Sequence, residues 1–401
     1  MAEDIKFEVV RKVADVNFKL RKFENVSKVD SISPPSVFIG SKLRYPTVNV
    51  GILSPVEKDE NAWVYDDVKY WSENNFEISD VLKLRNGLLN SRFQTKVSDA
   101  RMNKKFVEIA KNIAISSKQV DVEIELQNRL RFGREKDRVL TPHGMKGDLK
   151  KAEITGNVKI DKKLDRVMDD EIKASEGIEI LYKNDFNEYS LSQILSVGVM
   201  GLKKDKRIVP TRWSITATDD MLAKNLWRKV REYKWIENNE LFYGEFMGNQ
   251  YLVMLMPGVW SYELFELYLP NSSWNPSTEV KAATDMEGYS GRKNYAFNTV
   301  GGYYASRFPI LEYLNSIQRQ AKVLVLRIET PSYWAALGVW VVRESVRKAL
   351  QKKMKFDSQE ELLNSVKQIG KMKYNFDFSE ILEKSKLLKE TKEQTSLGGW
   401  F

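Results

Sequence analysis

The chain has 401 residues, of which 42% are hydrophobic and 30% charged. This composition is typical of a soluble globular protein large enough for two domains. The 64 Lys and Arg residues outnumber the 55 Asp and Glu residues and give a net charge of +9, which favours a polyanionic partner without identifying one. With no cysteine and a single histidine, His143, disulfides, thiolate metal sites and multi-histidine zinc sites are excluded.

Neither end of the chain nor its interior suggests a membrane. The first six residues are polar and acidic, unlike a secretory signal. The most apolar stretch, residues 251–260, is interrupted by Pro257 and Gly258 and is too short to cross a bilayer. We therefore expect a cytoplasmic protein with no membrane partner.

The first half of the chain alternates strand and helix signals after a polar segment over residues 1–32. The expected elements are strands at 37–39 and 48–50, a helix at 99–118, a strand at 120–126, a basic loop at 131–151 and a helix at 164–172. Met102, Phe106, Ile109 and Ile113 recur at helical spacing, whereas residues 120–126 alternate strictly between apolar and polar, as a half-buried strand does.

The second half predicts a sheet followed by helices. The expected elements are a helix that starts at Thr218, strands at 241–247, 250–256 and 259–269, a linker at 271–276, a helix at 303–320, a strand at 322–328, a helix at 332–353 and short charged helices to residue 393. Thr218 followed by two aspartates is typical of a helix start. Turn residues between the three strands predict an antiparallel meander. The fold class is therefore α+β, with mixed sheets packed with helices and a short flexible C-terminal tail.

The last eight residues carry a recognisable pattern. Gln394, Leu397, Trp400 and Phe401 fit the spacing Q-x-x-[LIM]-x-x-aromatic-aromatic, which resembles the peptides that dock on the replication sliding clamp (PCNA). That resemblance implies one helical turn that projects the three apolar side chains together, with the glutamine amide in a polar pocket. A tail that orders on binding suits such docking, because large aromatics carry most of an interface's energy.

Residues 209–220 form an unusually polar segment. Arg212, Ser214 and Thr216 offer donors for a phosphate, and Trp213 offers a ring for a base. The simpler interpretation is a strand that leads into a capped helix, and for Asp219 and Asp220 alone that interpretation is favoured.

A second segment, residues 285–307, combines acids, glycines and arginines. Gly288 and Gly291 permit close approach of a ligand to the backbone, and Arg292, Lys293 and Arg307 are candidates for phosphate contact. Asp285 and Glu287 are candidates to share a divalent ion, Mg²⁺ or Mn²⁺. The spacing matches neither a P-loop nor a dinucleotide fingerprint, so ordinary surface loops explain it equally well.

Two shorter loops complete the candidates. Lys42 and Arg44 follow a predicted strand and are further candidates for phosphate contact. His143 lies in a Gly- and Lys-rich loop, where a solvent-exposed histidine is a simpler interpretation than an acid–base group.

Four stretches of the sequence together resemble the archaeal Nre DNA-repair proteins. They are residues 33–40, 209–220, 285–292 and 337–340. The terminal peptide belongs to the same pattern. The resemblance covers residues 33–401 and implies a role in repair of damaged DNA through the clamp. It divides the chain into a polar segment (1–32), an Nre N-terminal region (33–284), an Nre C-terminal region (285–393) and a clamp-binding peptide (394–401).

One departure from the family limits what the resemblance implies. Many members begin with a cysteine zinc finger, and this chain has no cysteine, so it resembles the form without that finger. Three hypotheses stay open: a repair factor that binds DNA or a nucleotide, a metal-dependent phosphodiesterase or nuclease, and an adaptor that bridges the clamp to other repair proteins. Whether the chain is an enzyme, and through which residues, is left open by the sequence.

Overall fold

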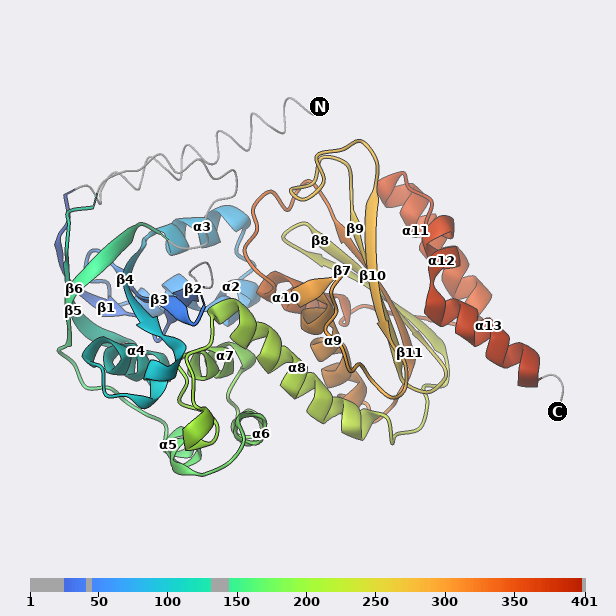
Figure 1. Ribbon diagram of the computed structural model, residues 1–401. Helices are drawn as coiled ribbons and strands as arrows, with labels where there is room; N and C mark the ends of the chain where they lie inside the picture. Colours follow the sequence, from blue (N-terminus) through green and yellow to red (C-terminus); the bar gives the residue numbers. More distant parts are fainter. Residues whose placement is uncertain (1–24, 41–44, 131–143, 399–401) are drawn as a thin grey trace. The chain divides into compact units, whose positions relative to one another are not determined.

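The chain folds as two compact units, Met1–Leu222 and Ala223–Phe401. The computed structural model describes the backbone of residues 25–40, 45–130 and 144–398 (Figure 1), with side chains described as far as Glu393. Within these described residues, no helix is both long and apolar enough to cross a membrane.

The first unit is built on a six-stranded mixed sheet in the order β1-β5-β6-β4-β3-β2. Its strands are β1 (Lys28–Ser33), β2 (Val37–Gly40), β3 (Thr47–Pro55), β4 (Leu88–Lys96), β5 (Val120–Leu126) and β6 (Lys146–Ile154). Neighbouring strands are antiparallel except β4 and β6. Three strands consecutive in sequence, β2, β3 and β4, form an antiparallel meander.

Short helices surround this sheet. They are η2 (Ala62–Asp66), α2 (Val68–Glu73), α3 (Ile78–Asn86), η3 (Val97–Arg101), α4 (Lys105–Ile115), α5 (Lys162–Asp169), α6 (Ala174–Tyr182), α7 (Glu188–Ser196), η4 (Lys203–Asp205) and the first turns of α8 (Thr211–Val230). The apolar face of α4, including Val107, Ala110 and Ile113, is buried, and the helix contacts β2, β3, β6 and α7. This is the amphipathic arrangement expected for a helix on a sheet.

The second unit has its own six-stranded sheet, in the order β10-β9-β11-β8-β7-β12. The strands are β7 (Asn239–Phe246), β8 (Asn249–Met256), β9 (Ser261–Tyr268), β10 (Lys281–Glu287), β11 (Lys322–Glu329) and β12 (Lys353–Phe356). Only β9 and β11 pair in parallel. Strand β11 is almost wholly buried and is apolar from Val323 to Leu326, as expected for a central strand covered on both faces.

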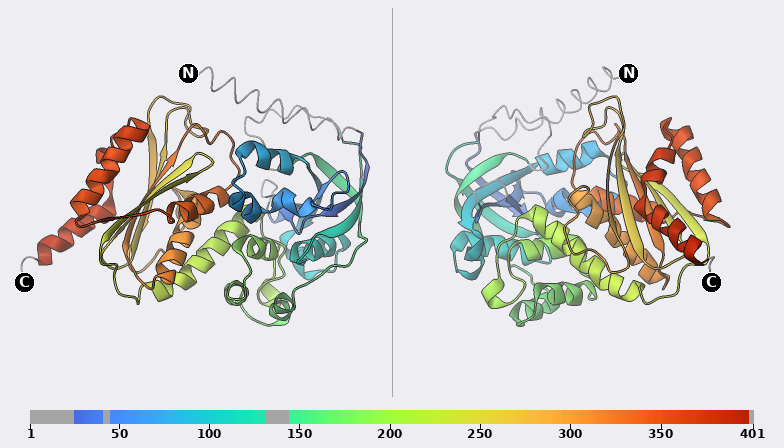
Figure 2. Two further views of the ribbon diagram at one scale, coloured as in Figure 1. Left: turned by 180° about the vertical axis from the view of Figure 1, so that it is seen from behind. Right: turned by 45° about the vertical axis from the view of Figure 1, so that its right-hand side comes forward.

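Helices cover both faces of the second sheet, as the two views in Figure 2 show. They are α9 (Val300–Ser316), α10 (Trp340–Ala349), α11 (Gln359–Tyr374), α12 (Ser379–Lys384) and α13 (Lys386–Gly398). One face, with Leu252, Phe265 and Leu326, packs in a single apolar core with α11, α12 and the start of α13. The opposite face, toward α9 and α10, carries a layer of buried charged residues described below.

The α+β class, with two mixed sheets and an antiparallel meander, is confirmed, but the meander predicted at 241–269 is wrong. Strands β7 and β8 do form a hairpin, closed by Met247 and Gly248, which both have positive φ as a tight hairpin turn requires. Strand β9 does not follow beside β8, because β11 inserts between them. A strand some 60 residues later in sequence gives no local signal of that insertion.

The helix predicted to start at Thr218 begins earlier, at Thr211. The carbonyl of Pro210 accepts hydrogen bonds from the backbone N–H groups of Trp213 and Ser214. Proline at a helix start is already in a helical φ, so this signal outweighs the capping pattern. Thr218 and Asp219 therefore lie buried within the helix, and the strand interpretation of residues 209–217 is also wrong.

Three further boundaries need correction. The helix predicted over 99–118 is a 3₁₀ turn followed by α4, so that Met102 lies exposed between the two. The basic loop predicted over 131–151 contains the start of strand β6 from Lys146, and its residues 131–143 lie outside the described part of the chain. The helix predicted over 332–353 is confined to α10, and Lys353 begins strand β12.

A glycine in β7 tests this packing. A Cβ at Gly244 would lie 2.5 Å from Cα of Ala349 in α10, and backbone cannot move aside as a flexible side chain can. We expect Gly244→Ala to lower the free energy of unfolding by about 1–3 kcal/mol. At Gly288, by contrast, an added Cβ meets nothing within 4 Å. Gly288→Ala is thus the matched control, and equal denaturation midpoints for the two variants would contradict the packing.

Candidate functional site

The start of α8 gathers the candidates of the polar segment but exposes only two of them. Arg212 and Trp213 are exposed, the tryptophan by 50%. Ser214 is fully buried and donates its hydroxyl hydrogen bond to the carbonyl of Thr211, while the Thr216 hydroxyl donates to the carbonyl of Arg212. The two hydroxyls are therefore engaged within the helix, which leaves Arg212 and Trp213 for a partner.

The chain after β2 meets this helix start. The backbone N–H of Ile39 donates to Oγ1 of Thr211 at 2.8 Å. The ring of Tyr45, itself 54% exposed, lies 5.8 Å from that of Trp213, measured between centroids. Two predicted segments are thus brought together into an exposed aromatic pair beside an arginine. Lys42 and Arg44, in the intervening loop, lie outside the described residues.

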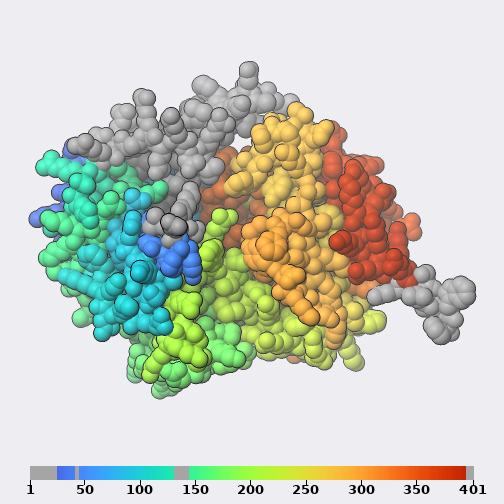
Figure 3. All heavy atoms as spheres, viewed as in Figure 1, coloured from blue at the N-terminus to red at the C-terminus, as the bar shows by residue number. Residues whose placement is uncertain are grey.

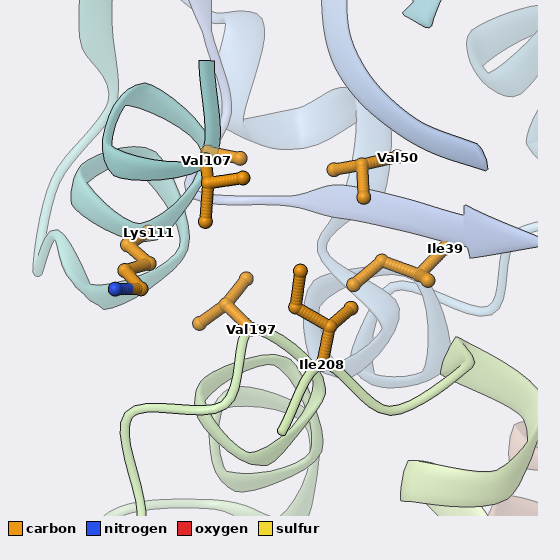
Figure 4. A pocket seen from close by; sticks show the side chains of 7 residues that line it. Ile39, Val50, Val107, Lys111, Val197 and Ile208 are labelled. Carbon is orange, nitrogen blue, oxygen red and sulfur yellow. The ribbon is translucent and has the colours of Figure 1, made fainter. Parts of the chain in front are cut away.

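The side chain of Ile39 also lines a small cavity of about 10 Å³ in the first unit (Figure 4). Its lining is almost wholly apolar: Ile39, Val50, Val107, Ala110, Lys111, Val197 and Ile208. The amine of Lys111 is engaged elsewhere, since it donates to the Ala100 carbonyl and pairs with Glu108, both at 2.7 Å. An apolar void of this size has room for at most about one water molecule, so we assign it to packing.

In the second unit, Asp285 and Arg292 form an ion pair. Nη2 of Arg292 lies 2.8 Å from Oδ1 of Asp285, and the same guanidinium donates to the carbonyls of Met286, Asn294 and Tyr295. The other carboxylate oxygen of Asp285 accepts from the backbone N–H groups of Asn298 and Thr299 and from the Thr299 hydroxyl. Arg292 therefore shapes the β10–α9 loop, and its donors are directed into the protein.

Glu287 and Arg307 form a second, wholly buried pair. Nη1 of Arg307, on α9, lies 2.7 Å from Oε2 of Glu287. The indole N–H of Trp260 donates to Oε1 of the same carboxylate at 3.1 Å. Arg307 is 2% exposed and so cannot reach a phosphate at the surface in this conformation.

The three remaining candidates of this loop differ in exposure. Gly288 and Lys293 are open to solvent, and half-buried Gly291, with φ of +72°, lies against the ring of Trp227. Of the five loop candidates for phosphate contact, Lys293 is the one whose charged group is both exposed and outside the buried ion pairs.

Asp285 and Glu287 lie two residues apart on β10, a strand that was not predicted from the sequence, and therefore face the same side of the sheet. Each is occupied by an arginine, which leaves an unfavourable donor set for Mg²⁺ or Mn²⁺. Across the described residues, no group of three Asp, Glu or His side chains is placed to hold a metal ion. This arrangement gives the nuclease hypothesis no support.

Sequence reasoning missed a third buried charge cluster, on β8, β9 and β11. Arg327 contacts Oε1 of Glu266 at 2.5 Å and Oε2 of Glu329 at 3.3 Å, and it donates twice to the side-chain oxygen of Asn249. Tyr268 donates to the second oxygen of Glu266. The alternation of Arg327 and Glu329 in an apolar strand was the available signal, because buried charges are rare unless paired.

Burial raises the pKa of Glu329 from an ordinary 4.5 to about 7, since the attraction of Arg327 offsets burial only in part and Glu266 adds repulsion. The carboxyl is 1% exposed. At neutral pH this cluster is thus divided between a protonated and an ionised form.

The sheet also holds the helix that leads to the terminal peptide. Glu263, fully buried on β9, accepts hydrogen bonds from the backbone N–H groups of Lys386 and Leu387 at the start of α13, at 3.1 and 3.0 Å. A carboxylate at a helix N-terminus satisfies free N–H groups and the helix dipole together. Sequence reasoning missed this anchor too, because its two halves lie more than 120 residues apart.

The terminal peptide begins within α13. The backbone at Gln394 and Leu397 belongs to this helix, whereas Trp400 and Phe401 lie outside the described residues. His143 lies outside them as well.

Comparison with known proteins identifies the family of this chain. The model for "Archaeal Nre, N-terminal" matches residues 2–275, and that for "Archaeal Nre, C-terminal" matches residues 287–400. The chain belongs to the archaeal Nre family. The two family models meet between residues 275 and 287, whereas the compact units divide at residue 222. The first sheet therefore lies wholly in the N-terminal family region, and the second sheet draws strands from both.

Relatives support the same assignment. The chain is 38% identical to "DNA repair protein NreA" of Haloferax volcanii over 83% of this chain and 81% of that protein. It is 37% identical to "DNA repair protein NreA" of Archaeoglobus fulgidus, over 83% of each chain. "DNA repair protein NreB" of Archaeoglobus fulgidus is 32% identical over 96% of this chain and 95% of its own length. No solved structure matches the chain.

The raised pKa of Glu329 has a measurable consequence. Between about pH 4.5 and 7 the folded protein keeps a proton that the unfolded chain releases, so this carboxyl makes the free energy of unfolding fall as pH rises. Glu329→Gln carries no such proton. We subtract the free energy of unfolding of the parent from that of Glu329→Gln. This difference should rise by on the order of 3 kcal/mol between about pH 4.5 and 7 and stay constant at higher pH. Urea titrations at several pH values measure it, and a flat difference would contradict the burial effect.

Proposed function

We propose that this chain is a DNA-repair protein that docks on the replication sliding clamp through residues 394–401 and contacts DNA through the start of α8. Its relatives are named as DNA repair proteins. The observation that carries the clamp partnership is the spacing of Gln394, Leu397, Trp400 and Phe401 at the end of the chain. This peptide begins within α13, a helix whose first turn is anchored to the second sheet.

The anchor matters for what the peptide does. Glu263 and the buried Leu387 and Leu388 hold the first turn of α13 on the second sheet. The peptide begins eight residues after Lys386 in sequence. A tether this short keeps the folded body close to the clamp once the peptide is bound, and it raises the effective concentration of any second contact that the body makes.

The DNA contact rests on the exposed group at the start of α8. Trp213 and Tyr45 present aromatic rings to solvent, and Arg212, which precedes Trp213 in the helix, adds an exposed charge. Aromatic rings beside cations suit a strand of nucleic acid, because rings stack on bases and cations attract the phosphates. The net charge of +9 acts in the same direction.

Replacing the two terminal aromatics tests the clamp contact. We expect Trp400→Ala with Phe401→Ala to weaken clamp binding at least about a hundredfold, because aromatic hot spots contribute about 2 kcal/mol or more each. The matched control is Thr395→Ala with Ser396→Ala, at positions that the pattern leaves unspecified. Calorimetric titration of the clamp measures both, and equal losses in the two double variants would refute the peptide assignment.

The contributions of the Arg212 charge and the Trp213 ring to oligonucleotide binding can be measured separately. We expect Arg212→Ala to weaken oligonucleotide binding and to lower the slope of log affinity against log salt by about 1, because one phosphate contact is lost. Trp213→Ala should weaken binding without a change in that slope. Arg228→Ala, an exposed arginine on the same helix, is the control. Fluorescence anisotropy over a salt series gives all three, and unchanged affinity in both test variants would leave an adaptor that acts through its tail.

A further inference from the structure

The loop between β10 and α9 is rigid at its base and aromatic at its surface. Over residues 288–300, three rings are exposed: Tyr289 by 41%, Tyr295 by 38% and Phe297 by 76%. The segment contains no Asp or Glu. Figure 3 shows the chain that leads into α9, in orange, at the surface of the view. Isolated exposed rings are ordinary, but Tyr295 and Phe297 contact each other on a loop without acidic residues.

The base of the loop is fixed by the contacts of Arg292 and Asp285. The guanidinium of Arg292 donates to the backbone carbonyls of Met286, Asn294 and Tyr295. The carboxylate of Asp285 accepts from the backbone N–H of Asn298, and the two side chains form an ion pair with each other. The backbone N–H of Ala296 also donates to the hydroxyl of Tyr304 on α9 at 3.0 Å. A loop held in this way presents its side chains in one arrangement, so little ordering entropy is lost when a ligand binds.

The rings are arranged so that the ring of Phe297 remains largely exposed to solvent. Tyr295 stacks on Tyr304 at 5.3 Å between centroids and 27° between planes. Phe297 meets Tyr295 edge to face at 5.4 Å and 74°. Tyr295 is thus braced by the helix and in turn braces Phe297, whose ring is left with most of its surface in water.

We propose that Phe297, held by Tyr295, stacks on an unpaired base of single-stranded nucleic acid, with Lys293 on the adjoining phosphate backbone. This inference rests on the proposed nucleic-acid contact and names the form of nucleic acid that this second surface takes. A base inside a duplex has both faces covered by its neighbours, whereas a base in a single strand or at a junction offers a face to a protein ring.

The exposed cation of this loop, Lys293, lies close in sequence to the exposed ring. Lys293 is exposed and precedes Phe297 by four residues, which at full extension span at most about 14 Å. Its amine is therefore within reach of a phosphate near the stacked base. Arg292 is the neighbouring cation, but its charge is already matched by Asp285. The loop therefore offers one free ring and one exposed cation.

Substitution of Phe297 tests the stacking. The probes are a fluorescently labelled 20-nucleotide single strand and the same sequence as a duplex, titrated with the full chain. We expect Phe297→Ala and Phe297→Leu each to weaken single-strand binding about tenfold, as loss of one base–ring stack does. Phe297→Tyr should retain affinity, and duplex binding should be unchanged in all three. Because the residue is largely exposed, the melting temperature should be unchanged too.

Each other result has a defined meaning. Full affinity in Phe297→Leu would show that an apolar contact suffices and would overturn stacking. Equal losses on single strand and duplex would overturn the preference for unpaired bases. If Arg212→Ala weakens binding while Phe297→Ala leaves single-strand affinity unchanged, this inference fails and the proposed function stands. If the parent chain binds neither probe at low salt, the proposed DNA contact fails and this inference fails with it.

Discussion

Charge buried in the second sheet is the constraint on which much of that unit depends. Five carboxylates, from Glu263, Glu266, Asp285, Glu287 and Glu329, are each less than a tenth exposed. An unpaired ionised carboxylate in such a place would cost several kcal/mol. The structure supplies a donor to every one of them, from the sheet itself for Glu266 and Glu329 and from the covering helices and loops for the other three.

Pairing of these charges fixes the elements around the sheet. Glu287 binds α9 through Arg307, and Asp285 binds the loop before α9 through Arg292. Glu266 and Glu329 share Arg327 within the sheet. Glu263, on the opposite face, accepts from the first turn of α13. Removal of any single partner would leave a buried charge, so the conformations of these elements are strongly coupled to one another.

The same pairing decides which residues are left for function. Arg292 and Arg307 resemble phosphate ligands in the sequence, yet their guanidinium groups are directed to buried carboxylates. What remains at the surface of that loop is a lysine and a set of rings. In the first unit, likewise, Ser214 is turned into its own helix, and Arg212 and Trp213 remain. At both surfaces, the exposed residues suit stacking and charge attraction more than catalysis.

Sequence reasoning succeeded where signals are local and failed where partners are distant. The alternation of residues 120–126 predicted β5, and the strand predicted at 322–328 corresponds to β11. The position of β11 between β8 and β9 depends on hydrogen bonds to strands about 60 to 80 residues away, which no local pattern encodes. Asp285 and Glu287 were predicted to share an ion in a loop, whereas they lie on strand β10 and pair with arginines 7 and 20 residues further along.

The terminal peptide remains a prediction from sequence, and the structure adds the helix that leads to it. With α13 fixed to the sheet by Glu263, loss of the last eight residues should remove the peptide without disturbing the body. The most direct test is calorimetric titration of the sliding clamp with the full chain and with a chain that ends at Glu393, both checked for equal melting temperatures. Our account predicts one full chain bound per clamp subunit and no detectable binding by the shortened chain. Equal affinity of the two chains would contradict it.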